Sequence, residues 1–256
     1  MAGEDFDRMT GSDLAQCAAS IAKAARLDLM RTAISLRNNT DPQAVAGRPE
    51  VWIEDLQNWR LTDHKRLRKD LAFAHRSAPD IELVQSGFDP IDCFRLYAST
   101  VARHGGQQRY GPEYFSALQS LASVSRFIGF FASVERGVVR GFSVVAAHGQ
   151  LAYYLHGAVD AAGRRQGISD LLLERLLTYA HDTGATRFTF MSSPWEQQGL
   201  LHFKRKWADS TGLSVTYDHG YSLLGSCAVL ASRWQRRYDR HRAALYATQR
   251  ETSLED

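Results

Sequence analysis

The chain has 256 residues, of which 44% are hydrophobic and 23% charged, with a formal net charge of +3. This balance is typical of a globular protein that buries a core, as one large domain or one domain with appendages. No apolar run approaches the roughly 18 residues that span a bilayer. The polar, acidic start MAGEDFDRMT lacks the pattern of a signal peptide. We therefore expect a cytoplasmic protein without a membrane span.

The three cysteines, Cys17, Cys93 and Cys227, are far apart and show no ligand spacing. A disulfide framework or a zinc site needs more cysteines at closer spacing. We therefore expect three reduced thiols and no bound metal.

The first quarter of the chain indicates mainly helix. Residues 12–30 place apolar side chains at helical spacing, and residues 38–49 have the composition of a linker. A second helix is expected over residues 62–77, with basic residues on its outer side. We therefore expect residues 1–60 to form a helical N-terminal extension.

The following segments predict a mixed sheet. Short glycine-bearing breaks separate three consecutive strands, as antiparallel hairpins require, and later strands alternate with helices. This order predicts an α/β (α+β) fold with a mostly antiparallel sheet flanked by helices, covering residues 61–225, followed by a basic C-terminal helix and tail over residues 226–256. Strands are expected at 81–85, 125–134, 138–147, 150–159, 186–191 and 213–223, and helices at 90–103, 112–121, 167–182 and 196–210.

Residues 154–173 combine a strand, a turn and a helix that opens on Arg164–Ser169. The first amides of a helix lack partners within it, and the helix dipole adds positive potential there. Gly167 has no side chain to keep a phosphate or carbonyl oxygen away. The segment therefore predicts an anion-binding turn.

Arg164, Gly167 and Ser169 resemble the Arg/Gln-x-x-Gly-x-Gly/Ala signature of the GNAT superfamily, which holds the pyrophosphate of acyl-CoA; Ser169 departs from the usual Gly or Ala. The stretch Gly199–Trp207 resembles the Gly-Leu-x-x-Phe-Lys segment of FemABX-type transferases. Residues 94–105 resemble the helix that opens the second GNAT-like domain of those enzymes. The resemblance covers about residues 62–225.

FemABX-like enzymes move an amino acid from aminoacyl-tRNA to an amine of a peptidoglycan precursor, and some small relatives modify peptide antibiotics. The resemblance therefore implies a tRNA-dependent aminoacyltransferase acting on a peptide acceptor, which is free or carrier-bound. Two departures stand out. The family usually has two GNAT-like domains, whereas this chain has room for one. The helix at 201–207 also lacks the tyrosine that CoA-dependent N-acetyltransferases commonly use as general acid.

The resemblance places Lys204 near the reacting ester, where its ammonium meets the developing oxyanion or the leaving ribose oxygen. His156 lies near the end of the strand that precedes the anion-binding turn, and it is expected to assist proton transfer. The expected donor-binding residues are Arg164, Arg165, Gly167, Ser169 and Phe203. The expected acceptor-binding residues are Tyr154, Ser192, Ser193 and Trp195.

Basic clusters outside this motif supply candidate contacts to tRNA phosphates, in addition to a basic segment at 233–242. The expected tRNA-binding residues are Lys65, Arg66, Arg68, Lys69, Arg205 and Lys206. Two alternatives remain: an acyl-CoA-dependent N-acyltransferase, and a non-catalytic GNAT-like module that binds RNA or protein. The central expectation is that Gly167 and Lys204 face the same cleft.

Overall fold

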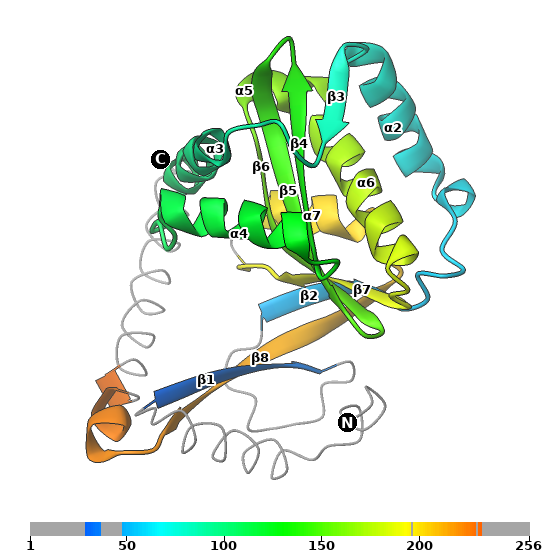
Figure 1. Ribbon diagram of the computed structural model, residues 1–256. Coiled ribbons are helices and arrows are strands. Elements are labelled where there is room, and N and C mark those ends of the chain that lie inside the picture. Colours follow the sequence, from blue (N-terminus) through cyan, green and yellow to red (C-terminus); the bar gives the residue numbers. More distant parts are fainter. Residues whose placement is uncertain (1–28, 37–47, 196, 229, 232–256) are drawn as a thin grey trace, which may run out of the picture. The chain divides into compact units, whose positions relative to one another are not determined.

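A computed structural model describes residues 29–36, 48–195, 197–228, 230 and 231 (Figure 1). The chain divides into two units, residues 1–34 with 215–256 and residues 35–214. In the first unit the described residues are most of β1 (Leu29–Leu36), the later half of β8 (Ser210–Gly220) and a helical segment at 223–228, 230 and 231. The second unit holds the helices and most of the sheet.

A mixed sheet forms the centre of the larger unit. Its strands follow the order β8-β2-β7-β6-β5-β4-β3, of which the first five residues of β8 belong to this unit. Among the described strand pairs of this unit, β6 and β7 run parallel and the others antiparallel. The predicted fold class is confirmed. The strands are β2 (Arg48–Ile53), β3 (Ile81–Val84), β4 (Ile128–Glu135), β5 (Val138–His148), β6 (Leu151–Val159) and β7 (Arg187–Ser192).

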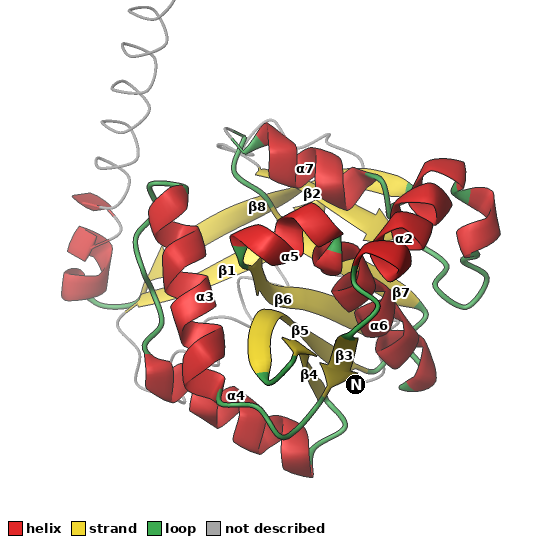
Figure 2. Cartoon of the chain, turned by 90° about the horizontal axis from the view of Figure 1, so that it is seen from above, coloured by secondary structure: helices red, strands yellow, loops and turns green. Residues whose placement is uncertain are grey.

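Helices cover both faces of this sheet (Figure 2). One face carries α2 (Lys65–Ser77), α5 (Ala161–Gln166), α6 (Ile168–Asp182) and α7 (Gln198–Arg205), and a short 3-10 helix, η2 (Leu61–Asp63), leads into α2. The other face carries α3 (Pro90–Arg103) and α4 (Pro112–Val124). Each layer buries an apolar stripe against the sheet, as amphipathic helices require.

Each face has its own hydrophobic core. The α6-side core joins α2, α6, α7 and the inward face of β7, and includes Leu67, Leu71, Leu172, Leu201, Phe188 and Phe190. The α4-side core joins α3 and α4 to β4 and β5, and includes Cys93, Phe115, Leu118, Phe130 and Phe142. The side on which a β6 or β7 side chain lies can therefore be identified from the core that it joins.

The element boundaries agree with the sequence for most of the larger unit. The expected helix at 90–103 coincides with α3, and the three expected hairpin strands correspond to β4, β5 and β6. Most of the expected helix at 12–30 lies outside the described residues, and residues 29 and 30 begin β1 instead. The expected C-terminal helix also lies largely outside the described residues.

The main error in the predicted organisation concerns residues 48–53. They were expected to belong to a linker and a helical extension, yet β2 lies between β7 and β8 in the larger unit. Six residues that begin with Arg-Pro are too few to show a clear strand periodicity, and the strand is specified by the two neighbours that it pairs with. The sheet therefore draws on residues that precede the expected domain boundary.

Of the cysteines, Cys17 lies outside the described residues, Cys93 is buried and Cys227 is exposed, both as free thiols. Burial raises the pKa of the Cys93 thiol, which keeps it protonated and inert at neutral pH. In the part of the chain that the structure describes, no helix is long and apolar enough to cross a membrane.

Candidate active site

The sheet opens between its two parallel strands. The ladder between β6 and β7 consists of Leu151–Arg187, Ala152–Phe188 and Tyr153–Thr189, although β6 continues to Val159 and β7 to Ser192. Beyond this ladder the facing edges no longer satisfy each other's backbone hydrogen bonds. The open end thus offers backbone groups to a bound molecule.

A bulge turns the end of β7. The pairing with β2 shifts by one residue between Trp52–Thr189 and Glu50–Ser192, so β7 carries an extra residue here. Met191 has a φ of 57°, a left-handed conformation that costs a non-glycine residue about 1–2 kcal/mol. Its N–H bonds to Thr189 Oγ1 at 3.0 Å. Bulges of this kind commonly re-aim groups beside active sites.

Lys204 is directed at this bulge from α7. Its side chain is one helical turn from Leu201, so both point inward, and only 4% of Lys204 is exposed. Lys204 Nζ donates to the Met191 carbonyl at 3.2 Å and to Ser193 Oγ at 2.9 Å. The Ser193 hydroxyl is itself buried. The structure thus brings together Lys204 and Ser193, two of the predicted site residues.

Burial gives Lys204 an unusual acidity. Loss of hydration lowers its pKa from 10.5 to about 8, and the negative charge of Glu50 partly opposes this change. Glu50 lies buried on β2 and accepts a hydrogen bond from the Thr189 hydroxyl. A lysine with this pKa remains mostly protonated at pH 7 but gives up its proton far more readily than an exposed lysine. It suits a group that stabilises negative charge and donates a proton.

His156 lies on the other face of the sheet. A bulge shifts the β5–β6 register between Val145–Tyr154 and Val144–His156, which leaves Leu155 as the extra residue. Without the bulge His156 would share the face of Tyr154, which packs on the α6-side core. Instead its ring neighbours come from α3, α4 and the segment between them: Tyr97, Tyr110, Tyr114 and Phe115.

The surroundings of His156 do not suit proton transfer at Lys204. Its Nε2 lies 2.7 Å from the Tyr114 hydroxyl, and burial lowers its pKa to about 4. The imidazole is therefore neutral at pH 7, and its Nε2 shares a hydrogen bond with the tyrosine hydroxyl. The expectation that His156 assists at the reacting ester is corrected, because the strand bulge directs it into the α4-side packing.

The expected anion-binding turn is folded into a helix of its own. The Asp160 side chain accepts from Gly163 N at 2.6 Å, and Arg164 N bonds to the Asp160 carbonyl at 3.0 Å. Gly167 ends α5 with a φ of 77° and starts α6, and a Cβ added there would lie 3.0 Å from the Ala74 Cβ. Helix therefore begins at Ala161 rather than at Arg164, and Gly167 allows close packing of α2.

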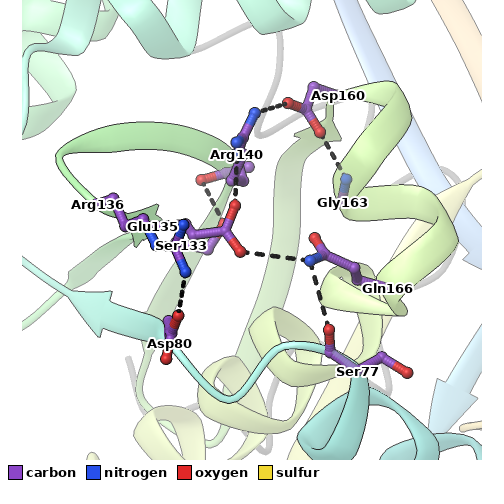
Figure 3. Close-up of polar contacts among 10 residues, drawn as sticks. Ser77, Asp80, Ser133, Glu135, Arg136, Arg140, Asp160, Gly163 and Gln166 are labelled. Atoms are coloured by element: carbon purple, nitrogen blue, oxygen red, sulfur yellow. Dashed lines mark hydrogen bonds and ion pairs between the residues drawn. The ribbon is translucent and has the colours of Figure 1, made fainter.

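A polar network holds α5 in this position (Figure 3). Arg140, the extra residue in a bulge between β4 and β5, contacts Glu135 at 2.9 Å and Asp160 at 3.2 Å. Gln166 Nε2 lies 3.4 Å from both the Ser77 carbonyl and Glu135 Oε1. These bonds join α5 to the β4–β5 hairpin and to the end of α2, so the turn is a fixed part of the fold.

Lys206 was expected to contact tRNA, and this expectation is wrong. Its Nζ forms ion pairs with Asp70 at 3.0 Å and with Asp170 at 2.7 Å, and only 13% of its side chain is exposed. It lies over the ring of Phe203 at 5.1 Å. Lys206 thus joins α7 to α2 and to the first turn of α6, and two carboxylates compensate its charge.

The remaining predicted basic residues are exposed, and their roles stay predictions. Arg164 also donates to the Val159 carbonyl at 3.1 Å. These residues occupy the outer surfaces of α2, α5 and α7: Lys65, Arg66, Arg68, Lys69, Arg164, Arg165 and Arg205.

The other predicted residues are spread around the open strand ends. Tyr154 has a pKa raised to about 12, mainly by burial and against a hydrogen bond with Ser143. Ser192 ends β7, Ser169 is half-buried in the first turn of α6, and Trp195 is 51% exposed. Gly167 and Lys204 lie on the same face of the sheet. The ion pair between Lys206 and Asp170 joins the helices that carry them, α6 and α7.

Sequence reasoning missed the groups that complete the surroundings of Lys204. Glu50 and Thr189 were not predicted, and neither was the contribution of the Met191 carbonyl. Glu50 is followed by three apolar residues, Val51, Trp52 and Ile53, and this short run carries no alternation that would have identified the strand. The left-handed conformation of Met191 leaves no trace in its residue type.

This arrangement, a mixed sheet that opens between two parallel strands with a buried cation at the opening, defines an acyltransferase fold. The sequence matches the acetyltransferase (GNAT) domain family over residues 62–205. The chain belongs to that family. A search of curated protein sequences gave no match.

Solved structures show the same fold at low sequence identity. FemX superposes with a TM-score of 0.62 and 14% identity, over 82% of this chain and 76% of that chain. The C-terminal domain of a putative lysylphosphatidylglycerol synthetase from Agrobacterium fabrum gives 0.52 and 13%, over 86% and 76%. A conserved protein from Bacteroides thetaiotaomicron gives 0.50 and 11%, over 79% and 73%. These similarities establish the fold.

Proposed function

We propose that the protein transfers an aminoacyl group from aminoacyl-tRNA to the amine of a peptide or peptidoglycan-precursor-like acceptor, forming a peptide bond. The observation that carries this proposal is Lys204, buried at the open end of β7 with a pKa of about 8. The fold similarity to FemX supports a FemABX-like interpretation. A peptide natural product is a suitable acceptor class.

The chemistry requires stabilisation of charge on oxygen. The acceptor nitrogen attacks the ester carbonyl carbon, a C–N bond forms, and negative charge develops on the carbonyl oxygen. The C–O bond to the ribose then breaks, and its electron pair goes to the ribose oxygen. The Lys204 ammonium stabilises this charge and donates a proton to the ribose oxygen. The proton that the attacking amine loses then restores the ammonium. No metal or external oxidant enters the balance.

The α5 turn favours this donor over acyl-CoA. The N–H of Gly163 is bonded to the Asp160 side chain and that of Arg164 to the Asp160 carbonyl, while Gly167 packs on Ala74. Arg164 and Gly167 belong to the residues that resemble the pyrophosphate-binding signature, and Gly163 directly precedes them. Backbone amides that already have partners bind a phosphate less well. The second candidate function is acyl-CoA-dependent N-acylation. It is supported by the match to the acetyltransferase family.

Incubation with charged total tRNA and candidate peptide amines, followed by mass spectrometry, tests the proposal. We expect the acceptor to gain the mass of one amino-acid residue, and prior RNase treatment to abolish the product. Activity should fall steeply between low and moderate salt, because phosphate contacts release counterions. RNase-resistant transfer from acyl-CoA would instead establish the second candidate.

The third possibility, a non-catalytic module, is tested by Lys204→Ala. We expect RNA binding to persist in this variant while product formation is lost. Wild-type protein that binds RNA but forms no product with any donor would contradict both enzymatic candidates.

A further inference from the structure

A chain of hydrogen bonds connects β2 to the ammonium of Lys204. Glu50 on β2 accepts a hydrogen bond from the Thr189 hydroxyl on β7. The Thr189 oxygen in turn accepts from the Met191 N–H at 3.0 Å. The Met191 carbonyl accepts from Lys204 Nζ at 3.2 Å. The chain therefore runs from β2 through the end of β7 to α7.

The first member of this chain has a fixed position in the sheet. β2 is an inner strand, and Glu50 lies opposite Ser192 of β7 and Gly212 of β8. Only 3% of Glu50 is exposed. A residue whose strand is paired on both sides has little freedom to move. Its carboxylate is therefore a fixed reference point for the hydroxyl that it binds.

The carboxylate of Glu50 decides how the Thr189 hydroxyl is oriented. An ionised carboxylate only accepts hydrogen bonds, whereas a hydroxyl has one proton to donate and lone pairs that accept. Because the Thr189 proton is donated to Glu50, the lone pairs of its oxygen are left for the Met191 N–H. The acidic side chain thus selects one of the orientations that the hydroxyl could adopt.

The Met191 peptide depends on this orientation. Its φ of 57° is a left-handed conformation that non-glycine residues rarely adopt, and it occurs in the bulge at the end of β7. Backbone strain of this kind persists only where the surrounding bonds over-determine it. The bond from the Met191 N–H to Thr189 therefore helps to hold the carbonyl to which Lys204 donates.

We propose that Glu50 is a positioning residue for the transfer reaction, and that it acts through Thr189 and Met191 to fix the direction of the Lys204 ammonium. This inference rests on the proposed function, in which that ammonium meets the oxygens of the reacting ester. A misdirected donor weakens the transition state more than it weakens substrate binding. The chain should therefore control kcat rather than KM.

The charge of Glu50 gives its removal a second consequence. Burial lowers the pKa of Lys204, and the negative charge of Glu50 partly opposes that change. Tyr153 of β6, which is paired with Thr189, is another titratable group near this carboxylate. Burial raises the pKa of Tyr153, Arg187 opposes the change and Glu50 adds to it, so the phenol is neutral at pH 7. Loss of the Glu50 charge should therefore lower the pKa of Lys204 further.

Turnover of Thr189 variants tests the hydrogen-bond chain. Thr189→Val keeps the shape of the side chain but removes the hydroxyl, and we expect kcat to fall roughly 10-fold to 100-fold with KM unchanged. Thr189→Ser restores the hydroxyl and should restore most of the rate. Ser133→Ala is the matched control, because it removes a buried hydroxyl of β4 that donates to the Gly141 carbonyl. An unchanged kcat in Thr189→Val, or a loss that Thr189→Ser does not restore, would overturn the inference.

Two measurements without turnover separate this inference from the proposed function. Thr189→Val should reduce the hydrogen-exchange protection of the Met191 amide, and Thr189→Ser should restore it. In an NMR titration of lysine-labelled protein, Glu50→Gln should lower the pKa of Lys204, whereas Glu82→Gln on exposed β3 should leave it unchanged. Both effects in a wild-type background that transfers nothing from any donor would overturn the proposed function and leave the hydrogen-bond chain standing. Neither effect in protein that transfers normally would overturn the inference alone.

Discussion

Two lysines, one in the last turn of α7 and one at its C-cap, meet opposite surroundings. Lys206 lies at the junction of α7 with α2 and α6 and is paired with two carboxylates, Asp70 and Asp170. Lys204 lies at the end of β7 and donates to two neutral oxygens, those of Met191 and Ser193. A buried cation with carboxylate partners has little left to offer a substrate. Lys204 feels the negative charge of Glu50, but its hydrogen-bond partners are neutral, so it retains charge that a developing oxyanion can use.

The largest expected effect is the loss of catalysis on removing the Lys204 ammonium. Lys204→Met keeps the length and apolar stem of the side chain but supplies no charge and no proton. We expect kcat to fall by about 10²–10³-fold, as for the loss of one oxyanion donor. Single-turnover transfer at saturating acceptor measures it, with His202→Ala on the exposed side of α7 as control. An unchanged kcat would assign the chemistry to other groups.

The second effect concerns stability at the α6–α7 junction. Lys206→Met leaves Asp170 buried without its cation, and we expect a loss of about 3 kcal/mol in the free energy of unfolding at pH 7. Denaturant unfolding measures it. The double variant Lys206→Met/Asp170→Asn should recover part of the loss, because the uncompensated carboxylate is gone. Equal losses in both variants would show that the ion pair is not the cause.

The third effect tests the α5–α6 turn. Gly167→Ala places a Cβ at a φ of 77° and 3.0 Å from Ala74, so we expect a loss of about 1–2 kcal/mol in unfolding free energy. Gly199→Ala is the control, because it meets no atom within 4 Å and lies in α7. That change should be neutral or stabilising by up to about 1 kcal/mol. A loss at Gly199 equal to that at Gly167 would contradict the packing argument.

The smallest effect is that Lys204→Met stabilises the protein near neutral pH. A pKa lowered from 10.5 to about 8 corresponds to a burial cost of about 3 kcal/mol. The variant removes this cost but leaves two acceptors without their donor, at about 1 kcal/mol each. The net expected gain is about 1 kcal/mol, opposite in sign to the effect of Lys206→Met.

The sign of the pH dependence follows from linkage. Below pH 8 the lysine is charged in both folded and unfolded protein, so the wild type carries the full cost. Between pH 8 and 10.5 the folded protein holds fewer protons than the unfolded one, and the wild type gains stability relative to the variant. Unfolding measured at pH 7 and pH 10 should show the variant's advantage reversed. A constant difference would mean that Lys204 titrates normally.

The sequence predicted the order of most elements and the sheet class, because apolar periodicity lies in consecutive residues. A local Phe-Lys motif made Lys204 a candidate, and its catalytic role stays a prediction. The sequence did not predict β2, whose place is set by pairing with β7 and β8. It also misplaced His156, because one extra residue in a strand reverses which face the following side chain takes. Lys206 was misjudged since its partners, Asp70 and Asp170, are distant in sequence.

The pH profile of single-turnover transfer tests most directly whether the buried lysine donates the proton. In the wild type the rate should rise as the acceptor amine loses its proton and then fall above about pH 8, as Lys204 loses its own. In Lys204→Met the residual rate should show the rise without the fall. A fall at the same pH in the variant would assign that ionisation to another group and contradict the role given to Lys204.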